Sequence, residues 1–172
     1  MKALLLTIAA LTAALSLAVS LGSAYAANGS TATGTKVAVA SSRLGNVLVD
    51  GRGHTLYLFA KDRHGKSSCT SQCAAFWPPL IAAGKPRAAA GAKASLLGTT
   101  KRPDGRLQVT YNHHPLYTFV KDTKKGQTNG EELNAFGDEW YAVSATGAKV
   151  EKADATSSDS GYPAAGGYGP GY

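Results

Sequence analysis

Residues 54–62 of this 172-residue chain read HTLYLFAKD, and residues 114–122 read HPLYTFVKD. When residues 45–76 are aligned with 105–136 without a gap, at an offset of 60, ten of 32 positions are identical, most of them aromatic or turn residues. Self-similarity at a fixed period is typical of an internal duplication. The sequence therefore predicts two diverged repeats of about 60 residues.

Each repeat is predicted to open with a β-hairpin. The stretches NVLVDGRGHTLYLF and RLQVTYNHHPLYTF each place two alternating, β-prone runs around a turn. The turns contain residues that tolerate positive φ, namely Gly51, Gly53 and Asn112. Alternation along the second strand of each hairpin predicts four core rings, those of Tyr57, Phe59, Tyr117 and Phe119.

The leading strand of the second hairpin alternates as well. Its apolar residues Leu107, Val109 and Tyr111 share one face, opposite Gln108 and Thr110. This pattern predicts an antiparallel sheet with one face in the core and one face in water.

Three more segments, KVAVAS (36–41), SLLGTTKR (95–102) and WYAV (140–143), are also predicted strands. Seven or eight short strands with little helix indicate an all-β fold, as a single compact domain in the form of a sandwich or a partly closed barrel.

The chain divides into four parts by composition. Residues 1–26 are predicted to be a signal peptide cleaved before Ala27, because an apolar run after Lys2 ends in Ala-Tyr-Ala. A retained membrane-spanning helix is the alternative. Residues 27–35 are interpreted as a linker, 36–150 as the β domain with repeats at about 44–83 and 104–144, and the Gly/Tyr/Pro-rich residues 151–172 as a disordered tail. We expect a secreted or envelope-associated monomer.

The predicted mature domain is basic. Residues 27–150 hold 16 Lys and Arg against 8 Asp and Glu, a surplus of 16 − 8 = +8. Such a charge attracts polyanions, such as an anionic cell-wall polymer or a membrane surface. Nucleic acid is not an expected partner, since none of the motifs of nucleic-acid-binding domains is present.

An aspartate and a basic loop follow the aromatic strand in each repeat. Asp62 and Asp122 stand where the strand ends, and each is predicted to accept hydrogen bonds from the turn that it begins. The loops carry cations at matching places, which are candidates for anion binding: Lys61, Arg63 and Lys66 in the first repeat, and Lys121, Lys124 and Lys125 in the second.

Cysteines and histidines are the remaining candidates for chemistry. Cys69 and Cys73 are the only cysteines, and in an exported protein we expect them to form a disulfide. Redox activity is the alternative, although redox-active pairs usually have C-x-x-C spacing. Metal binding by imidazoles is a weaker hypothesis, because the spacing of the four candidates is not diagnostic: His54, His64, His113 and His114. No cofactor and no catalytic residue is predicted, since no hydrolase or phosphate-loop motif is present.

Several linked motifs resemble one known family. YLFAKD and YTFVKD both fit Yx(FWY)xxD, and CTSQCAAFWPPL, RPDGRLQVTYNHHPLY and FGDEWYAV stand around them in the expected order over residues 44–144. In these motifs the chain resembles the bacterial secreted-repeat family, also described as predicted lipoproteins. The resemblance implies an exported, envelope-associated domain of two repeats, and it implies no reaction. Many relatives carry a lipobox cysteine, which is absent near Ala26, so lipid anchoring is not expected.

The sequence as a whole predicts a binding or structural module of the cell envelope without catalytic activity. Its ligand would be an anionic wall or membrane component held by the basic loops. The alternative is an envelope redox or metal-binding protein that uses Cys69, Cys73 and the histidines.

Overall fold

The computed structural model describes residues 34–151, so the predicted signal peptide, most of the linker and nearly all of the tail lie outside the described residues. Regular structure is mainly β, in nine strands: β1 Lys36–Ser42, β2 Gly45–Asp50, β3 Tyr57–Phe59, β4 Arg87–Ala88, β5 Leu97–Lys101, β6 Leu107–Tyr111, β7 His114–Pro115, β8 Leu133–Ala135 and β9 Asp138–Ala142. Two short helices accompany them, α1 (Ser71–Phe76) and the 3-10 turn η1 (Ala94–Leu96). Within this part of the chain, no helix has the length and apolarity needed to cross a membrane.

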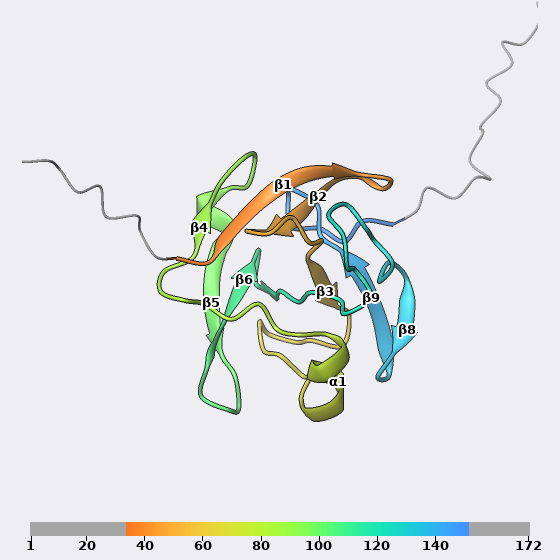
Figure 1. The fold of residues 1–172 in the computed structure, drawn as a ribbon. Coiled ribbons are helices and arrows are strands. Elements are labelled where there is room, and N and C mark those ends of the chain that lie inside the picture. The colour runs from red at the N-terminus through yellow and green to blue at the C-terminus, as the bar shows by residue number, and fades with distance from the viewer. Residues whose placement is uncertain (1–33, 152–172) are drawn as a thin grey trace, which may run out of the picture. The chain divides into compact units, whose positions relative to one another are not determined.

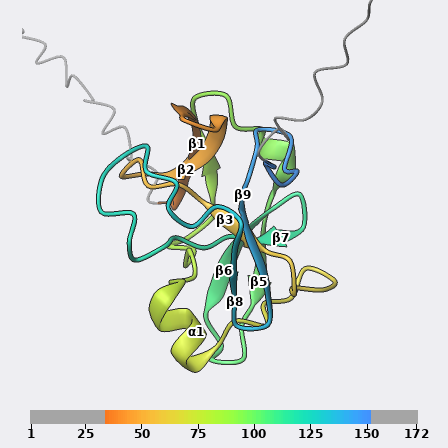
Figure 2. The same ribbon diagram turned by 90° about the vertical axis from the view of Figure 1, so that its right-hand side faces the viewer.

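The strands form three small sheets, with the orders β2-β1-β4, β3-β9-β8 and β5-β6-β7. All pairs are antiparallel except β1 with β4. In Figure 1 the β1–β2 hairpin lies above, β5 and β6 on one side, β9 and β8 on the other, and α1 below. The turned view in Figure 2 shows β3 beside β9, its partner in the second sheet. For residues 34–151 the all-β prediction is confirmed, in the form of three sheets that do not close into a barrel.

The turns follow the local chemistry of the sequence. β6 and β7 are joined by Asn112 and His113, whose φ angles are both positive (47° and 66°). In the first repeat Gly53 has φ 90°, and the Asp50 backbone amide donates to the His54 carbonyl across the turn. Asn and Gly accept this backbone geometry more readily than other residues.

The prediction of one wet sheet face is wrong for β6. Gln108 is fully buried and Thr110 nearly so, whereas Leu107 is exposed. Gln108 is satisfied inside the protein, because its Oε1 accepts from Arg102 at 2.6 Å and its Nε2 donates to the Leu116 carbonyl at 2.8 Å. Arg102 and Leu116 are six and eight residues away from Gln108. The alternation of polar and apolar residues along β6 could therefore not reveal these two hydrogen bonds.

Strand β3 is buried on both faces, because it lies between two core clusters. Tyr57 and Phe59 belong to one cluster, and Leu58 belongs to the other together with the preceding Leu56. All four predicted core rings are buried, which confirms the central expectation from the alternating pattern.

The two repeats are interlocked rather than placed side by side. β3 of the first repeat pairs with β9 of the second, with Tyr57 opposite Ala142. Reciprocally, Tyr117 of the second repeat lies opposite Pro79 of the first. Tyr57 and Tyr117 also face each other and exchange two backbone hydrogen bonds of 2.9 and 3.0 Å. Each repeat therefore completes its aromatic strand with the closing segment of the other.

These pairings correct the ungapped alignment in the C-terminal part of each repeat. Ala142 and Pro79 occupy equivalent places, which gives an offset of 142 − 79 = 63 residues there. Trp77 and Trp140 are thus structurally equivalent. Phe76 and Phe136, identical at an offset of 60, are in contact but are not equivalent. The longer second loop, which precedes β9, accounts for the three additional residues.

A stack of four aromatic rings forms the centre of the core. The rings alternate between the repeats in the order Phe119, Trp77, Trp140 and Phe59, with successive centroids 4.2, 3.9 and 4.1 Å apart. Tyr57 makes a T-shaped contact with Trp77, and Tyr117 makes the same contact with Trp140. Large aromatic side chains contribute more to burial than any other residues, so much of the stabilisation depends on both repeats being present.

We therefore predict that neither repeat folds alone. When the chain is divided between Gly91 and Ala92, each fragment should lack near-ultraviolet circular dichroism and a cooperative unfolding transition. Mixing the fragments should restore both signals, because only the pair rebuilds the ring stack and the exchanged strands. A single fragment that unfolds cooperatively would contradict the interlocked arrangement.

Candidate functional site

The repeated tyrosine and aspartate of the motif bind each other across the repeats. The Tyr57 hydroxyl donates to Asp122 Oδ2 at 2.6 Å, and the Tyr117 hydroxyl donates to Asp62 Oδ2 at 2.7 Å. Hydrogen bonds to a charged acceptor contribute about 1.5–3 kcal/mol each. The motif is thus a reciprocal clasp, and the two aspartates do not converge on a common ligand position.

The other oxygen of each aspartate holds its own loop, as the sequence predicted. Asp62 Oδ1 accepts from the backbone amide and the hydroxyl of Ser68, at 2.7 and 2.8 Å. Asp122 Oδ1 accepts from the backbone amide of Asn129 at 2.9 Å. Sequence reasoning found this role and missed the bond to the tyrosine of the other repeat.

Burial changes the ionisation of this clasp. Desolvation, followed by the hydrogen bond and charge of Asp122, raises the pKa of Tyr57 far above its ordinary value. Desolvation and the charge of Asp62 do the same to the pKa of Tyr117. Desolvation also raises the pKa of Asp62, against the opposing effect of its hydrogen bonds. The two phenols of the clasp are therefore neutral at ordinary pH and act as hydrogen-bond donors.

Two arginines, absent from the sequence-based candidates, reinforce the same crossing. Arg43 donates to the hydroxyl and the carbonyl of Thr128, at 2.7 and 2.9 Å. Arg102 donates to the Ser67 hydroxyl and the Cys69 carbonyl, at 2.8 and 2.7 Å. Arg43 lies in the turn between β1 and β2 and holds the basic loop of the second repeat. Arg102 lies in the turn between β5 and β6 and holds the basic loop of the first repeat. The loops are thereby anchored at their far ends, and their cations are left at the surface.

Cys69 and Cys73 form the predicted disulfide, with their Cα atoms 5.3 Å apart. Both cysteines are buried. Cys73 lies within α1, and the buried Trp77 follows directly after the end of this helix. The bridge therefore fixes the short segment that places Trp77 in the ring stack.

Three of the four candidate histidines gather at one pocket. His64, His113 and His114 line a hollow of about 360 Å³ together with Asp62. His54 lies elsewhere, with its Nδ1 3.5 Å from Asp50 Oδ2. Among residues 34–151, no three His, Cys, Asp or Glu side chains are placed so that they could hold a metal ion.

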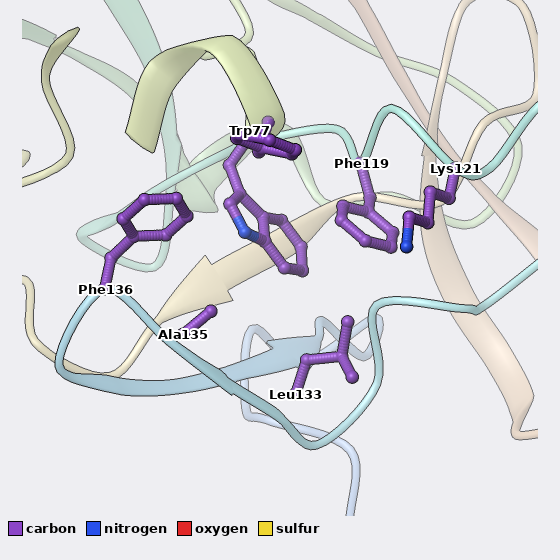
Figure 3. Close-up of a pocket in the computed structure, with 7 residues that line it drawn as sticks. Trp77, Phe119, Lys121, Leu133, Ala135 and Phe136 are labelled. Atoms are coloured by element: carbon purple, nitrogen blue, oxygen red, sulfur yellow. The ribbon is translucent and has the colours of Figure 1, made fainter. Parts of the chain in front are cut away.

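A second hollow is apolar and lies at one side of the ring stack. This apolar groove, of about 240 Å³, is lined by Phe76, Trp77, Phe119, Lys121, Leu133, Ala135 and Phe136. Figure 3 shows Trp77 and Phe119 along one side and Leu133 and Ala135 along the other, with Phe136 and Lys121 near opposite ends. Lysine is the only polar side chain in the lining, so the groove suits hydrocarbon or an aromatic ring with an anionic group nearby.

The first lysine of each basic loop lies at this groove. Lys121 is part of its lining, and Lys61 Nζ donates to the Phe136 carbonyl at 3.2 Å. Further along the chain the two loops diverge. Lys125 of the second loop packs against Gly53, whereas Gly65 of the first loop lies near the His113 carbonyl. The six candidate cations are all exposed, but they do not form one continuous patch around a single point.

The comparison with protein-family models finds a match over both repeats. A family described as a secreted repeat of unknown function matches residues 38–81 and 98–144. The chain belongs to this family of secreted repeats. The two matched segments include most of β1 and of β5 and so begin earlier than the repeats expected at 44–83 and 104–144. No curated protein and no solved structure matches the chain.

Membership supports a secreted or envelope location in general and brings no reaction with it. The crossed tyrosine–aspartate bonds explain why this secreted repeat carries the motif twice, since the phenol of each copy is held by the carboxylate of the other. The motif is thus accounted for by structure, and the exposed groove and lysines are left as the candidate binding site.

The clasp predicts a loss of stability in alkali. A phenol whose pKa is higher in the folded than in the unfolded state stabilises the protein fully below the unfolded value of about 10, and less as the pH rises towards the folded value. With two such tyrosines, the free energy of unfolding should fall by about 2.7 kcal/mol per pH unit above pH 10, at about 1.4 kcal/mol each.

Urea unfolding between pH 8 and 11 measures this slope. The double variant Tyr57→Phe with Tyr117→Phe should be less stable at pH 8 but should have a shallower slope above pH 10. Equal slopes for the two proteins would show that the phenols are not protected in the fold.

Proposed function

We propose that this secreted repeat protein is a non-catalytic binding module that attaches to anionic components of the cell envelope through its basic loops. The observation that carries the proposal is the placement of Lys61 and Lys121, at the same position in both repeats, beside an exposed apolar groove. Cations beside an apolar hollow are suited to an anionic ligand.

The charge of the domain supports the same function. The six loop cations are exposed, and the surplus of basic residues between 27 and 150 is 16 − 8 = +8. The loops are held at their far ends by Arg43 and Arg102. Their lysines are therefore presented from a fixed backbone, which lowers the conformational entropy lost on binding.

A redox or metal-binding role has less support. Thiol–disulfide exchange requires access to a sulfur atom, and Cys69 and Cys73 are both buried beside the ring stack. The pocket with His64, His113 and His114 brings imidazoles from both repeats together, without the close grouping that metal ligation needs.

The proposal predicts salt-sensitive binding to an anionic polymer without acyl chains. Poly(glycerol phosphate) is a suitable probe, and binding by the mature protein should weaken steeply between 50 and 500 mM NaCl because exposed charges are screened. Near an anionic surface each cation contributes about 1 kcal/mol. Replacing Lys121, Lys124 and Lys125 by Gln should therefore weaken binding by more than about tenfold.

A variant with the same net charge provides the control. Lys85, Lys93 and Lys101 are exposed and lie outside the basic loops, so their replacement by Gln should have a much smaller effect. An equal loss in both triple variants would mean that only net charge matters, and binding that salt does not weaken would exclude the electrostatic attachment.

A further inference from the structure

Exposed apolar side chains are concentrated at one place. Within residues 34–151 five large apolar side chains are 38–47 % exposed: Phe76, Leu107, Val120, Leu133 and Phe136. Three of them, Phe76, Leu133 and Phe136, line the apolar groove. A contiguous exposed apolar patch marks a site of interaction with a protein, a membrane or a ligand.

Phe136 is kept on this surface at a cost in backbone strain. It occupies the first of two turn positions between β8 and β9, where Phe136 has φ 62° and Gly137 has φ 93°. Two-residue turns with positive φ at both positions strongly favour Asn-Gly, and a bulky residue there is a clear outlier. The Phe136 ring contacts the Phe76 ring at the surface, with centroids 6.0 Å apart, so the strained turn holds an exposed pair of rings at the groove.

The chemistry of the lining residues limits the classes of ligand that the apolar groove can bind. A polysaccharide needs hydrogen-bonding side chains for its hydroxyl groups, and Lys121 is the only polar side chain present. A drug-sized soluble ligand fills a pocket of about 300–1,000 Å³, whereas this groove has about 240 Å³ and three exposed apolar lining residues, Phe76, Leu133 and Phe136. An open apolar surface of this size suits partial insertion of the protein into a lipid layer.

The charges beside the groove identify the kind of lipid layer. Lys121 lines the groove and Lys61 reaches the carbonyl of Phe136, so cations border the exposed rings. Apolar side chains bordered by lysines bind at the boundary between headgroups and acyl chains, and they prefer anionic lipids. Lysine stems can also extend towards phosphate groups while the rings lie deeper.

We propose that the apolar groove is an interfacial membrane-binding surface for anionic phospholipid. Phe76, Leu133 and Phe136 enter the boundary of the acyl chains, and Lys61 and Lys121 contact the lipid phosphates. The inference deepens the proposed function and rests on it, because it names a phospholipid surface as the anionic component of the envelope.

Tryptophan fluorescence tests this surface directly. The chain has two tryptophans, Trp77 in the groove wall and Trp140 stacked on it. Vesicles of phosphatidylglycerol with brominated acyl chains should quench their fluorescence, and vesicles of phosphatidylcholine should not. Phe136→Asn places the favoured residue in the strained turn, so its melting temperature should equal or exceed that of the wild type, while its affinity for the anionic vesicles should fall about tenfold.

Leu107→Ser is the matched control, because Leu107 is a large exposed apolar residue that does not line the groove. It should leave both vesicle binding and quenching unchanged. Three results would overturn the membrane inference: no quenching by brominated lipid, equal losses in the Phe136 and Leu107 variants, or a wild-type dimer that Phe136→Asn dissociates. If poly(glycerol phosphate) still binds in any of these cases, the electrostatic function stands without the membrane surface; if neither probe binds at low salt, both proposals fail.

Discussion

The stacked pair Trp77 and Trp140 is the contact on which the rest of the structure depends. Each indole is covered on its other face by a phenylalanine of the opposite repeat, and the tyrosine hydroxyls beside the stack are held by the opposite aspartates. A repeat on its own would leave a large ring half-covered and a carboxylate without its donor, and both losses are large compared with the stability of a small domain. We therefore expect duplication to be a condition for folding in this protein.

The features of this arrangement that depend on neighbouring residues could be predicted from the sequence. Alternation located the buried rings, glycine and asparagine located the turns, and the position of Asp62 and Asp122 indicated a bond to the following loop. The sequence could not show whether each tyrosine binds the aspartate of its own repeat or that of the other repeat. Both arrangements use the same residues at the same spacing. The burial of Gln108 was missed for a related reason, since its partners Arg102 and Leu116 belong to other segments.

The candidate site was harder to predict than the core. Phe76 and Phe136 are identical at the offset of the duplication and look like a repeated core position, yet the three-residue difference between the loops places them together at the surface. The strain at Phe136 is visible in the sequence only as a Phe-Gly pair before a strand. The arginines that anchor the basic loops have different spacing in the two repeats, so the alignment did not bring them together.

The central claim is that the motif acts between the repeats, and double-mutant cycles measure this directly. Unfolding free energies of Tyr57→Phe, Asp122→Asn and the double variant should give a coupling of about 0.5–3 kcal/mol, because these side chains are in contact. The cycle of Tyr57→Phe with Asp62→Asn, which joins residues of one repeat, should be additive within about 0.5 kcal/mol. Strong coupling within the repeat and none across it would contradict the interlocked fold.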